Sequence, residues 1–391
     1  MVRSVAVIGA TGSVGATALQ VIGDHPDRLR AGVLAAHRSV EALAALCARH
    51  QPDVAIIGDQ TLEASLARRL AAAGVRCDIA SGADAITQAT MSDGCNTLIA
   101  AIAGGAGIAS TLGAARVGKR LLLANTESTV IAGPLLAQAL GQGGGQLIPL
   151  NRRQNAIFQC LSDDSLNLNA DRLRLSLVGS GGVFRGRHRS DLMTVGPEDL
   201  RMSVGNARKP QVLVNAASLM DLGLDLIEAH HLFRVPPDQL EILLQPEDRV
   251  QAVVAGVSGS APVQLRALDA HAAISSALLW PERADKAGWL PELSSPAALA
   301  FEKPDMGTFR CLALALQALQ AGGDATTILN AANDVAVAAF LAGALPFLSI
   351  ADLIEQVLTE LPPQPVVDIQ TLSERDRTAR EAARRVLRNA C

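Results

Sequence analysis

The first 150 residues alternate short apolar runs with segments of helical spacing, and this alternation restricts the fold more than any other feature. Runs such as SVAVIG, DVAIIGD and QLIPL are separated by segments such as VEALAALCARH and LEASLARRLAAAG. Apolar strands that alternate with helices predict a parallel sheet covered on both faces. Ligands of such sheets bind beyond the carboxyl ends of the strands. We therefore expect residues 1–150 to form a Rossmann-like α/β domain.

The remainder of the chain changes pattern twice. In residues 151–280, LEILLQ, QAVVAGV and APVQLRAL are predicted strands, and QVLVNAASLMDLGLDLIEAHHLF reads as a strand followed by a helix. Residues 281–306 are rich in Pro and turn residues, which is typical of a linker. Residues 307–391 hold long helical segments such as TILNAANDVAVAAFLAG. We predict an α+β connecting or catalytic domain, a linker and a C-terminal helix bundle with these bounds.

Composition argues against several classes of partner. The formal net charge of −4 argues against a nucleic-acid binder, and 2% aromatic residues without any Tyr argue against base-stacking surfaces. The longest uncharged stretch, residues 97–115, holds four glycines and is interpreted as strand, turn and helix, not as a membrane span. The N-terminus shows no secretory pattern, and the six cysteines form no CxxC pair. We expect a reduced, cytoplasmic protein.

A glycine-rich turn, VAVIGATGSVG, lies at residues 5–15 between the first predicted strand and the first predicted helix. Gly9, Gly12 and Gly15 form the pattern G-x-x-G-x-x-G, a variant of the dinucleotide-binding turn. Such glycines allow a tight turn and close approach of the backbone, so that a pyrophosphate meets the helix N-terminus. The alternative is a glycine-rich turn without a ligand.

The end of the second predicted strand favours NADP over NAD. An NAD site expects an acidic residue there to hold the ribose hydroxyls. This chain has His37, Arg38 and Ser39 instead, and a cation with two hydrogen-bonding groups suits a 2′-phosphate. The alternative is a solvated loop arginine.

Two further motifs lie in the second predicted domain. The turn VGSGGVFRGR, residues 178–187, can present backbone N–H groups to an anion, or it is a simple β-turn. His230 and His231 are interpreted as a helix surface and not a metal site, because no other residue at ligand spacing accompanies them.

Several segments together resemble the 1-deoxy-D-xylulose 5-phosphate reductoisomerase family, and they cover nearly the whole chain in the same order. They are GATGSVGATALQVIGDHPDRLRAGVLAAHRSVEALAAL, GKRLLLANTESTVIAG, NAIFQCL, GSGGVFR, GLDLIEAHHLF and TTILNAANDVAVAAFL. The resemblance implies an NADPH-binding domain, a connecting catalytic domain that carries a dimer interface, and a C-terminal four-helix bundle. It also implies an oxidoreductase that uses NADPH and a divalent metal to rearrange and reduce a phosphorylated ketose.

On the cofactor side, the sequence keeps the pattern of the family. The resemblance assigns one group of residues to the NADPH turn, one to the 2′-phosphate end and one to the nicotinamide ribose. In that order they are Thr11, Gly12, Ser13 and Val14; Arg38 and Ser39, beside His37; and Asn125 and Glu127.

The metal site of the family is altered. Where the family has Asp-Ser-Glu-His, with the Asp and Glu as metal ligands, this chain has Asn-Arg-Arg-Gln at residues 151–154. The third ligand, a Glu in the family, falls on Asp225. One carboxylate beside two arginines is a poor site for a hard cation. At about 4 Å and an effective dielectric of about 20, each arginine opposes a cation by about 4 kcal/mol per unit charge. We therefore predict no catalytic metal.

The substrate-phosphate site is altered as well. Ser180 matches a Ser that contacts the phosphate in the family, but the Ser, Asn and Lys of the next segment are replaced by Ala216, Asp221 and Leu222. The substrate-binding Lys of the family is Thr126 here. An Asp repels a phosphate, and Leu removes its neutralising partner.

These observations leave three functions open. The first is an NADPH-dependent oxidoreductase without metal, in which Arg152 and Arg153 bind an anionic substrate directly, for example a carboxylate, with Asp221 and Asp225 as acid–base candidates. In that hypothesis Ser180 and Thr126 also contact the substrate. The second is a non-catalytic, regulatory NADPH-binding protein. The third is the family's own reaction in isoprenoid biosynthesis. The resemblance implies a homodimer in each case.

Overall fold

The computed structural model describes residues 2–102, 104–161, 173–204, 209–256, 261–265, 270–282 and 299–390. The chain divides into two compact units, each described here by itself. Unit 1 comprises Met1–Ser128, Leu135–Phe158 and Ala267–Leu290. Unit 2 comprises Thr129–Pro134, Gln159–Arg266 and Pro291–Cys391. Most of the predicted linker, residues 283–298, lies outside the described residues, and the predicted domain bounds stay a prediction.

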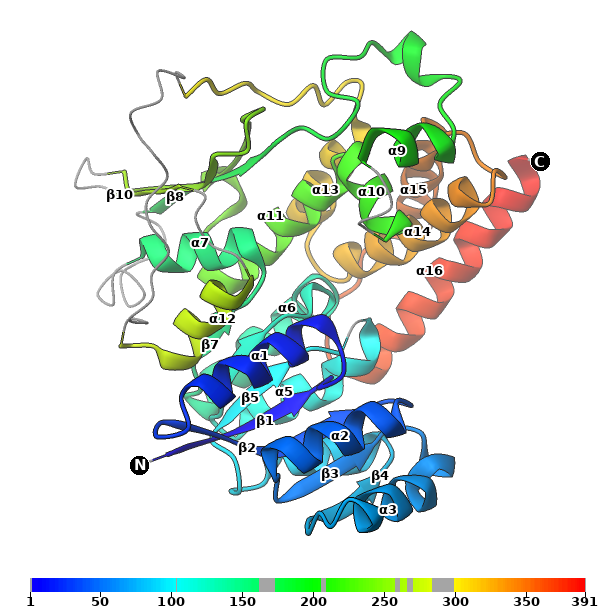
Figure 1. The fold of residues 1–391 in the computed structure, drawn as a ribbon. Coiled ribbons are helices and arrows are strands. Elements are labelled where there is room, and N and C mark those ends of the chain that lie inside the picture. Colours follow the sequence, from blue (N-terminus) through cyan, green and yellow to red (C-terminus); the bar gives the residue numbers. More distant parts are fainter. Residues whose placement is uncertain are drawn as a thin grey trace. The chain divides into compact units, whose positions relative to one another are not determined.

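The described part of unit 1 contains a seven-stranded sheet in which every pair of neighbours is parallel (Figure 1). The strand order is β4-β3-β2-β1-β5-β6-β7. The strands are β1 (Arg3–Ile8), β2 (Leu29–Ala36), β3 (Val54–Ile57), β4 (Asp78–Ser81), β5 (Thr97–Ala100), β6 (Arg120–Leu123) and β7 (Leu147–Pro149). The central strands are almost completely buried because helices cover the sheet. The prediction of a Rossmann-like fold is therefore confirmed.

Helices connect these strands, as the sequence pattern predicts. They are α1 (Ser13–Asp24), α2 (Val40–His50), α3 (Glu63–Ala72), α4 (Ala83–Met91), α5 (Ile108–Arg116), α6 (Thr126–Gly143) and α7, which begins at Arg152 and ends at Cys160. A later helix, α12 (Ala270–Leu279), packs against α1 in the same unit. Arg120 Nη1 donates to the Trp280 carbonyl at 2.7 Å just beyond α12, which satisfies a carbonyl at the helix end.

Unit 2 has a four-stranded mixed sheet among its described residues, in the order β11-β10-β8-β9. Its strands are β8 (Leu173–Gly179), β9 (Leu240–Leu244), β10 (Val250–Gly256) and β11 (Val263–Leu265). Helices α9 (Pro197–Val204), α10 (Pro210–Ala217) and α11 (Met220–Phe233) belong to the same unit. The predicted strand at QVLVN is wrong, because these residues form α10. Pro210 occupies the first turn of that helix, where its missing N–H costs nothing.

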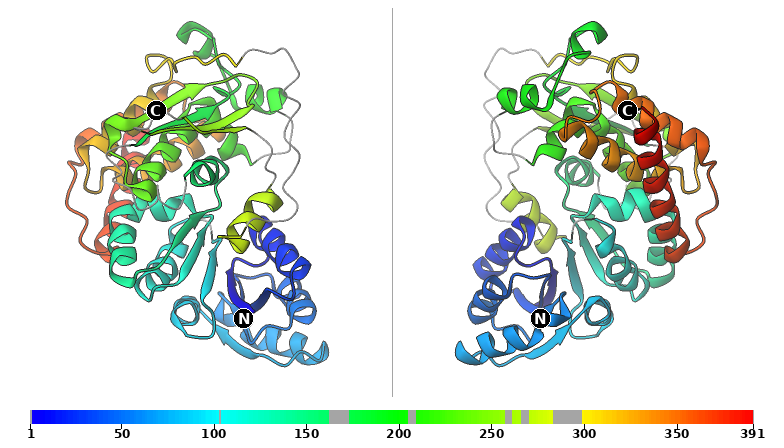
Figure 2. Two further views of the ribbon diagram at one scale, coloured as in Figure 1. Left: turned by 90° about the vertical axis from the view of Figure 1, so that its left-hand side faces the viewer. Right: turned by 90° about the vertical axis from the view of Figure 1, so that its right-hand side faces the viewer.

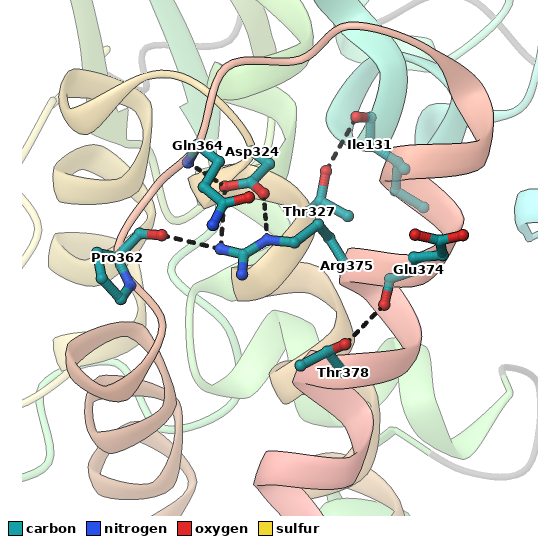
Figure 3. Close-up of polar contacts among 8 residues, drawn as sticks. All are labelled: Ile131, Asp324, Thr327, Pro362, Gln364, Glu374, Arg375 and Thr378. Atoms are coloured by element: carbon teal, nitrogen blue, oxygen red, sulfur yellow. Dashed lines mark hydrogen bonds and ion pairs between the residues drawn. The ribbon is translucent and has the colours of Figure 1, made fainter.

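The C-terminal region is helical, as predicted. Within residues 299–390, α13 (Arg310–Ala321), α14 (Ala325–Leu341), α15 (Ser349–Glu360) and α16 (Ile369–Ala390) pack side by side (Figure 2). The N-terminus of α14 is held by Asp324, which is 2% exposed and accepts from the Gln364 amide at 2.8 Å. Arg375 of α16 forms an ion pair with the same carboxylate and donates to the Pro362 carbonyl at 2.8 Å (Figure 3). None of the described helices is long and apolar enough to cross a membrane.

Candidate functional site

The turn between β1 and α1 has the geometry that the three glycines predict. Gly9 has φ +96°, and a Cβ placed there would lie 2.6 Å from the Ala101 carbonyl oxygen. Gly15 lies inside α1, where a Cβ would lie 2.3 Å from the Gly9 carbonyl oxygen. The backbone of the turn therefore approaches both α1 and the end of β5 too closely for any side chain. The N-cap of α1 is Gly12, an exposed residue without a side chain, so no side-chain cap bonds the first amides of the helix there.

A cavity of about 490 Å³ lies beside this turn in unit 1. Thr11, Gly12 and His37 line it, so the structure brings together three of the predicted cofactor residues. The remaining wall is mostly small or apolar, and includes Gly58, Ile86, Thr87 and Ser110. Pockets of this size with few polar groups are typical of nucleotide and small-molecule sites.

The three residues expected at the 2′-phosphate end follow β2 directly, and all are exposed. Arg38 Nε lies 3.4 Å from an oxygen of Asp59, which follows β3. The hydrogen bonds that Asp59 accepts from Thr61, together with the nearby charges of Arg38 and His37, lower the pKa of Asp59. Sequence reasoning missed Asp59. The signal was its position after the apolar run VAII, because neighbouring parallel strands end at the same edge of the sheet.

Asn125, Thr126 and Glu127 lie at the start of α6. Asn125 is 3% exposed, and its side-chain oxygen accepts from the Ser128 amide at 3.3 Å as the N-cap of the helix. Its amide nitrogen donates to the Gly104 carbonyl at 3.0 Å. Asn125 therefore fixes the first turn of α6 to the loop after β5, and Thr126 and Glu127 are half-buried within that turn.

The two arginines of the NRRQ segment occupy the first turn of α7, directly after β7. Asn151 Oδ1 accepts from the Arg153 amide at 3.3 Å, which makes Asn151 the cap of this helix. Asn155 Nδ2 donates to the Pro149 carbonyl at 2.9 Å and ties α7 to the strand. Arg152 and Arg153 are half-buried residues of this first turn, where the helix dipole also contributes positive partial charge.

In unit 2, the predicted substrate residues lie on the turn after β8 and on α11. Ser180 is exposed. Two residues later, Gly182 has φ +71°, and a Cβ at that position would lie only 2.4 Å from the Ala216 carbonyl oxygen, so the turn requires glycine there. Asp221 is half-buried in the first turn of α11, and Asp225 is 5% exposed one turn later. Leu222 is 1% exposed and packs on Gly179 at the end of β8.

His231, near the end of α11, is half-buried and does not lie on an open helix surface as predicted. Its ring packs on Gly133, where a Cβ would lie 2.2 Å from His231 Cδ2. Burial, and to a smaller extent the charge of His230, lower the pKa of His231 to about 3. The imidazole is therefore neutral at physiological pH.

Three family models cover most of this chain. The model described as 1-deoxy-D-xylulose 5-phosphate reductoisomerase matches residues 5–133. Two C-terminal domain models of the same enzyme match residues 147–233 and 265–382. The 1-deoxy-D-xylulose 5-phosphate reductoisomerase of Xanthomonas oryzae pv. oryzae is 46% identical over 98% of this chain and 97% of its own length. The chain belongs to the 1-deoxy-D-xylulose 5-phosphate reductoisomerase family.

Other members of the reductoisomerase family agree with this assignment. The enzyme of Paraburkholderia phymatum is 39% identical over 98% of this chain and 95% of its own length. The solved structure of the reductoisomerase from Zymomonas mobilis, a complex with NADPH, has a TM-score of 0.92 and 36% identity, with 99% of each chain covered. A reductoisomerase structure with fosmidomycin and magnesium has a TM-score of 0.87 and 31% identity, covering 99% of this chain and 98% of its own.

The donor set for a metal is poor at residues 151 and 153, which the resemblance assigns to metal-ligand positions. Asn151 uses its side-chain oxygen as a helix cap, and Arg153 carries no oxygen donor. Across the described residues, no group of three or more His, Cys, Asp or Glu is placed to hold a metal ion. A hard divalent cation requires several oxygen ligands, so the residues present do not fit one. Metal independence itself stays a prediction.

Proposed function

We propose that this protein is an NADPH-dependent oxidoreductase of the reductoisomerase type, and that 1-deoxy-D-xylulose 5-phosphate is the first substrate to test. The observation that carries this proposal is 46% identity to a reductoisomerase over 98% of the chain. These comparisons favour the family's own reaction, the third function that the sequence left open, over a different substrate. The intact glycine turn and the cavity beside it support NADPH as the cofactor.

In this proposal, separate groups of residues would bind the parts of NADPH and the substrate. Bound NADPH supplies the hydride. The turn at Thr11–Val14 and the N-terminus of α1 would bind the pyrophosphate, and Arg38 would bind the 2′-phosphate with two or more N–H donors. The first turn of α6, with Thr126 and Glu127, would lie against the nicotinamide ribose and the substrate. Ser180 would donate to an anionic group of the substrate.

A second candidate function is favoured by the first turn of α7 and by Leu222. Two arginines at a helix N-terminus can bind a carboxylate or phosphate directly by bidentate hydrogen bonds. Leu222 is buried where the reductoisomerases carry a phosphate-binding Lys, so it offers that anion nothing. In this candidate, a different anionic substrate is reduced without a metal ion, and Asp221 or Asp225 moves the proton. A non-catalytic NADPH-binding role stays as the alternative.

One set of measurements separates these candidates. NADPH binding to the purified protein is followed by its fluorescence, and NADPH oxidation by absorbance with 1-deoxy-D-xylulose 5-phosphate, with and without magnesium or manganese. Magnesium-dependent oxidation would establish the family's own reaction and exclude metal independence. Oxidation with another anionic carbonyl compound but not with this ketose would favour the second candidate. Tight binding without turnover across a broad carbonyl panel would favour the non-catalytic role, and no NADPH binding would refute all three.

Replacement of both Arg152 and Arg153 by Ala tests the second candidate directly. If the arginines hold the substrate, KM should rise by about 100-fold or more, since charge-assisted hydrogen bonds contribute about 1.5–3 kcal/mol each. The dissociation constant of NADPH should be unchanged. Arg116→Ala, at an exposed position in the last turn of α5, is the control. A collapse of NADPH affinity in the double variant would contradict the assignment.

The expected homodimer and cytoplasmic location also stay proposals. Light scattering coupled to size-exclusion chromatography would test the first, and fractionation of the source cells the second.

A further inference from the structure

Helix α6 contains an internal proline, and the structure compensates for it with side chains from another helix. Ala132 has non-helical angles (φ −118°, ψ 24°), and Pro134 follows it inside the same helix. In a regular helix the amide of residue 134 donates to the carbonyl of residue 130, but Pro134 has no amide hydrogen. The Val130 carbonyl, on a residue that is 1% exposed, thus loses its helical donor.

Two threonines in the first turn of α14 supply donors at this point. Thr326 Oγ1 donates to the Val130 carbonyl at 2.7 Å, and Thr327 Oγ1 donates to the Ile131 carbonyl at 3.0 Å. Both threonines are almost fully buried, at 4% and 0% exposure. A buried carbonyl without a donor is destabilising, so these two hydroxyls stabilise the kinked form of α6.

The anchor for the kink is itself rigidly held. Figure 3 shows Thr327 at the Ile131 carbonyl, one helical turn from Asp324 and its ion pair with Arg375. On the other side of the kink, Gly133 packs against the His231 ring. The kinked segment at residues 129–134 belongs to unit 2, as do His231, Thr326 and Thr327.

The first turn of α6 runs without a break into the kinked segment at residues 129–134. Asn125 holds its start to the Gly104 carbonyl, and Thr326 and Thr327 hold its end at Val130 and Ile131. Thr126 and Glu127, which are proposed to lie at the nicotinamide ribose and the substrate, are in this short interval. We propose that Thr326 and Thr327 are positioning residues for the NADPH site, acting through the proline kink of α6. This inference rests on the proposed NADPH-binding function.

The test is a Thr326→Val and Thr327→Val double variant, which keeps the side-chain shape and removes both donors. We expect the NADPH dissociation constant to rise about tenfold, because the first turn of α6 would no longer be held in the geometry that the nucleotide requires. Amide exchange of residues 126–131, followed by mass spectrometry, should become faster. Thr378→Val in α16 removes a hydroxyl that bonds to its own helix at 2.9 Å, and it should change neither quantity.

Pro134→Ala separates positioning from general stability. Pro134 is exposed, so this change removes little packing and restores the amide hydrogen that a straight helix would use. The melting temperature should not fall, yet NADPH should bind several-fold more weakly because the first turn shifts. NADPH affinity equal to wild type in both variants would overturn the inference while the proposed function stands. If the wild-type protein does not bind NADPH, the proposed function fails. Unchanged amide exchange in the double valine variant would show that the two threonines do not hold the kink, and would overturn the inference by itself.

Discussion

Gly15→Ala tests whether the turn between β1 and α1 is shaped for close backbone approach. Gly15 is buried inside α1, with ordinary helical angles, so an alanine there suffers no backbone strain. Its new Cβ, however, would lie 2.3 Å from the Gly9 carbonyl oxygen and 2.7 Å from Ala10 Cα. Real Cβ contacts do not fall below 3.0 Å, so the turn must move by at least 3.0 − 2.3 = 0.7 Å.

Two energies of opposite sign decide the stability of this variant. Alanine is better than glycine in a helix by about 1 kcal/mol. Overpacking of a close contact costs about 1–3 kcal/mol. The net loss of unfolding free energy is therefore small, about 0–2 kcal/mol. The displaced turn should nevertheless weaken NADPH binding about tenfold or more, because binding depends on its geometry.

The assay is a fluorescence titration of NADPH beside a thermal melt, with Gly141→Ala as the matched control. Gly141 also lies in a helix, α6, but nothing stands within 4 Å of the Cβ that alanine would add. This control should gain up to about 1 kcal/mol of stability and bind NADPH as wild type does. NADPH affinity in Gly15→Ala equal to that of the control would refute the assignment of the turn to the cofactor.

Three further predictions follow from single side chains. Arg38→Ala should weaken NADPH binding about 10- to 100-fold, through loss of a charge-assisted contact, and leave NADH binding unchanged, as competitive titrations would show. His231 has a folded pKa of about 3, below its unfolded value of 6.5, so protonation favours the unfolded state. The stability that neutral His231 contributes is complete above pH 6.5 and is lost as the pH falls toward 3. In His231→Phe, denaturant titrations should show a smaller decrease in the free energy of unfolding between pH 6.5 and pH 3. Asp324→Ala removes a buried carboxylate and leaves the half-buried Arg375 without this partner, so it should reduce the free energy of unfolding by about 2–4 kcal/mol, with Asp352→Ala on the exposed face of α15 as a milder control.

Much of unit 1 could be read from the sequence because it depends on neighbours in the chain. The order of apolar runs and helical segments predicted the parallel sheet, and the spacing of Gly9, Gly12 and Gly15 predicted the turn that the structure shows. The strand predicted at QVLVN was wrong because Val and Leu suit both strands and buried helix faces. The structure has a helix there because Pro210 suits a helix start and because Leu213 and Val214 pack into the interior on one helix face.

The sequence by itself determined the kind of fold, the likeness to the reductoisomerases and the residue types at the NRRQ segment. These features need only local spacing and order along the chain. The tertiary structure alone decided that Asp59 stands beside Arg38, that Leu222 is buried under the end of β8, and that Thr326 and Thr327 complete the kinked helix α6. The threonines are 196 residues away from the carbonyls to which they donate. No local pattern carries such pairings, because they arise only when separate elements pack and each buried polar group must find a partner.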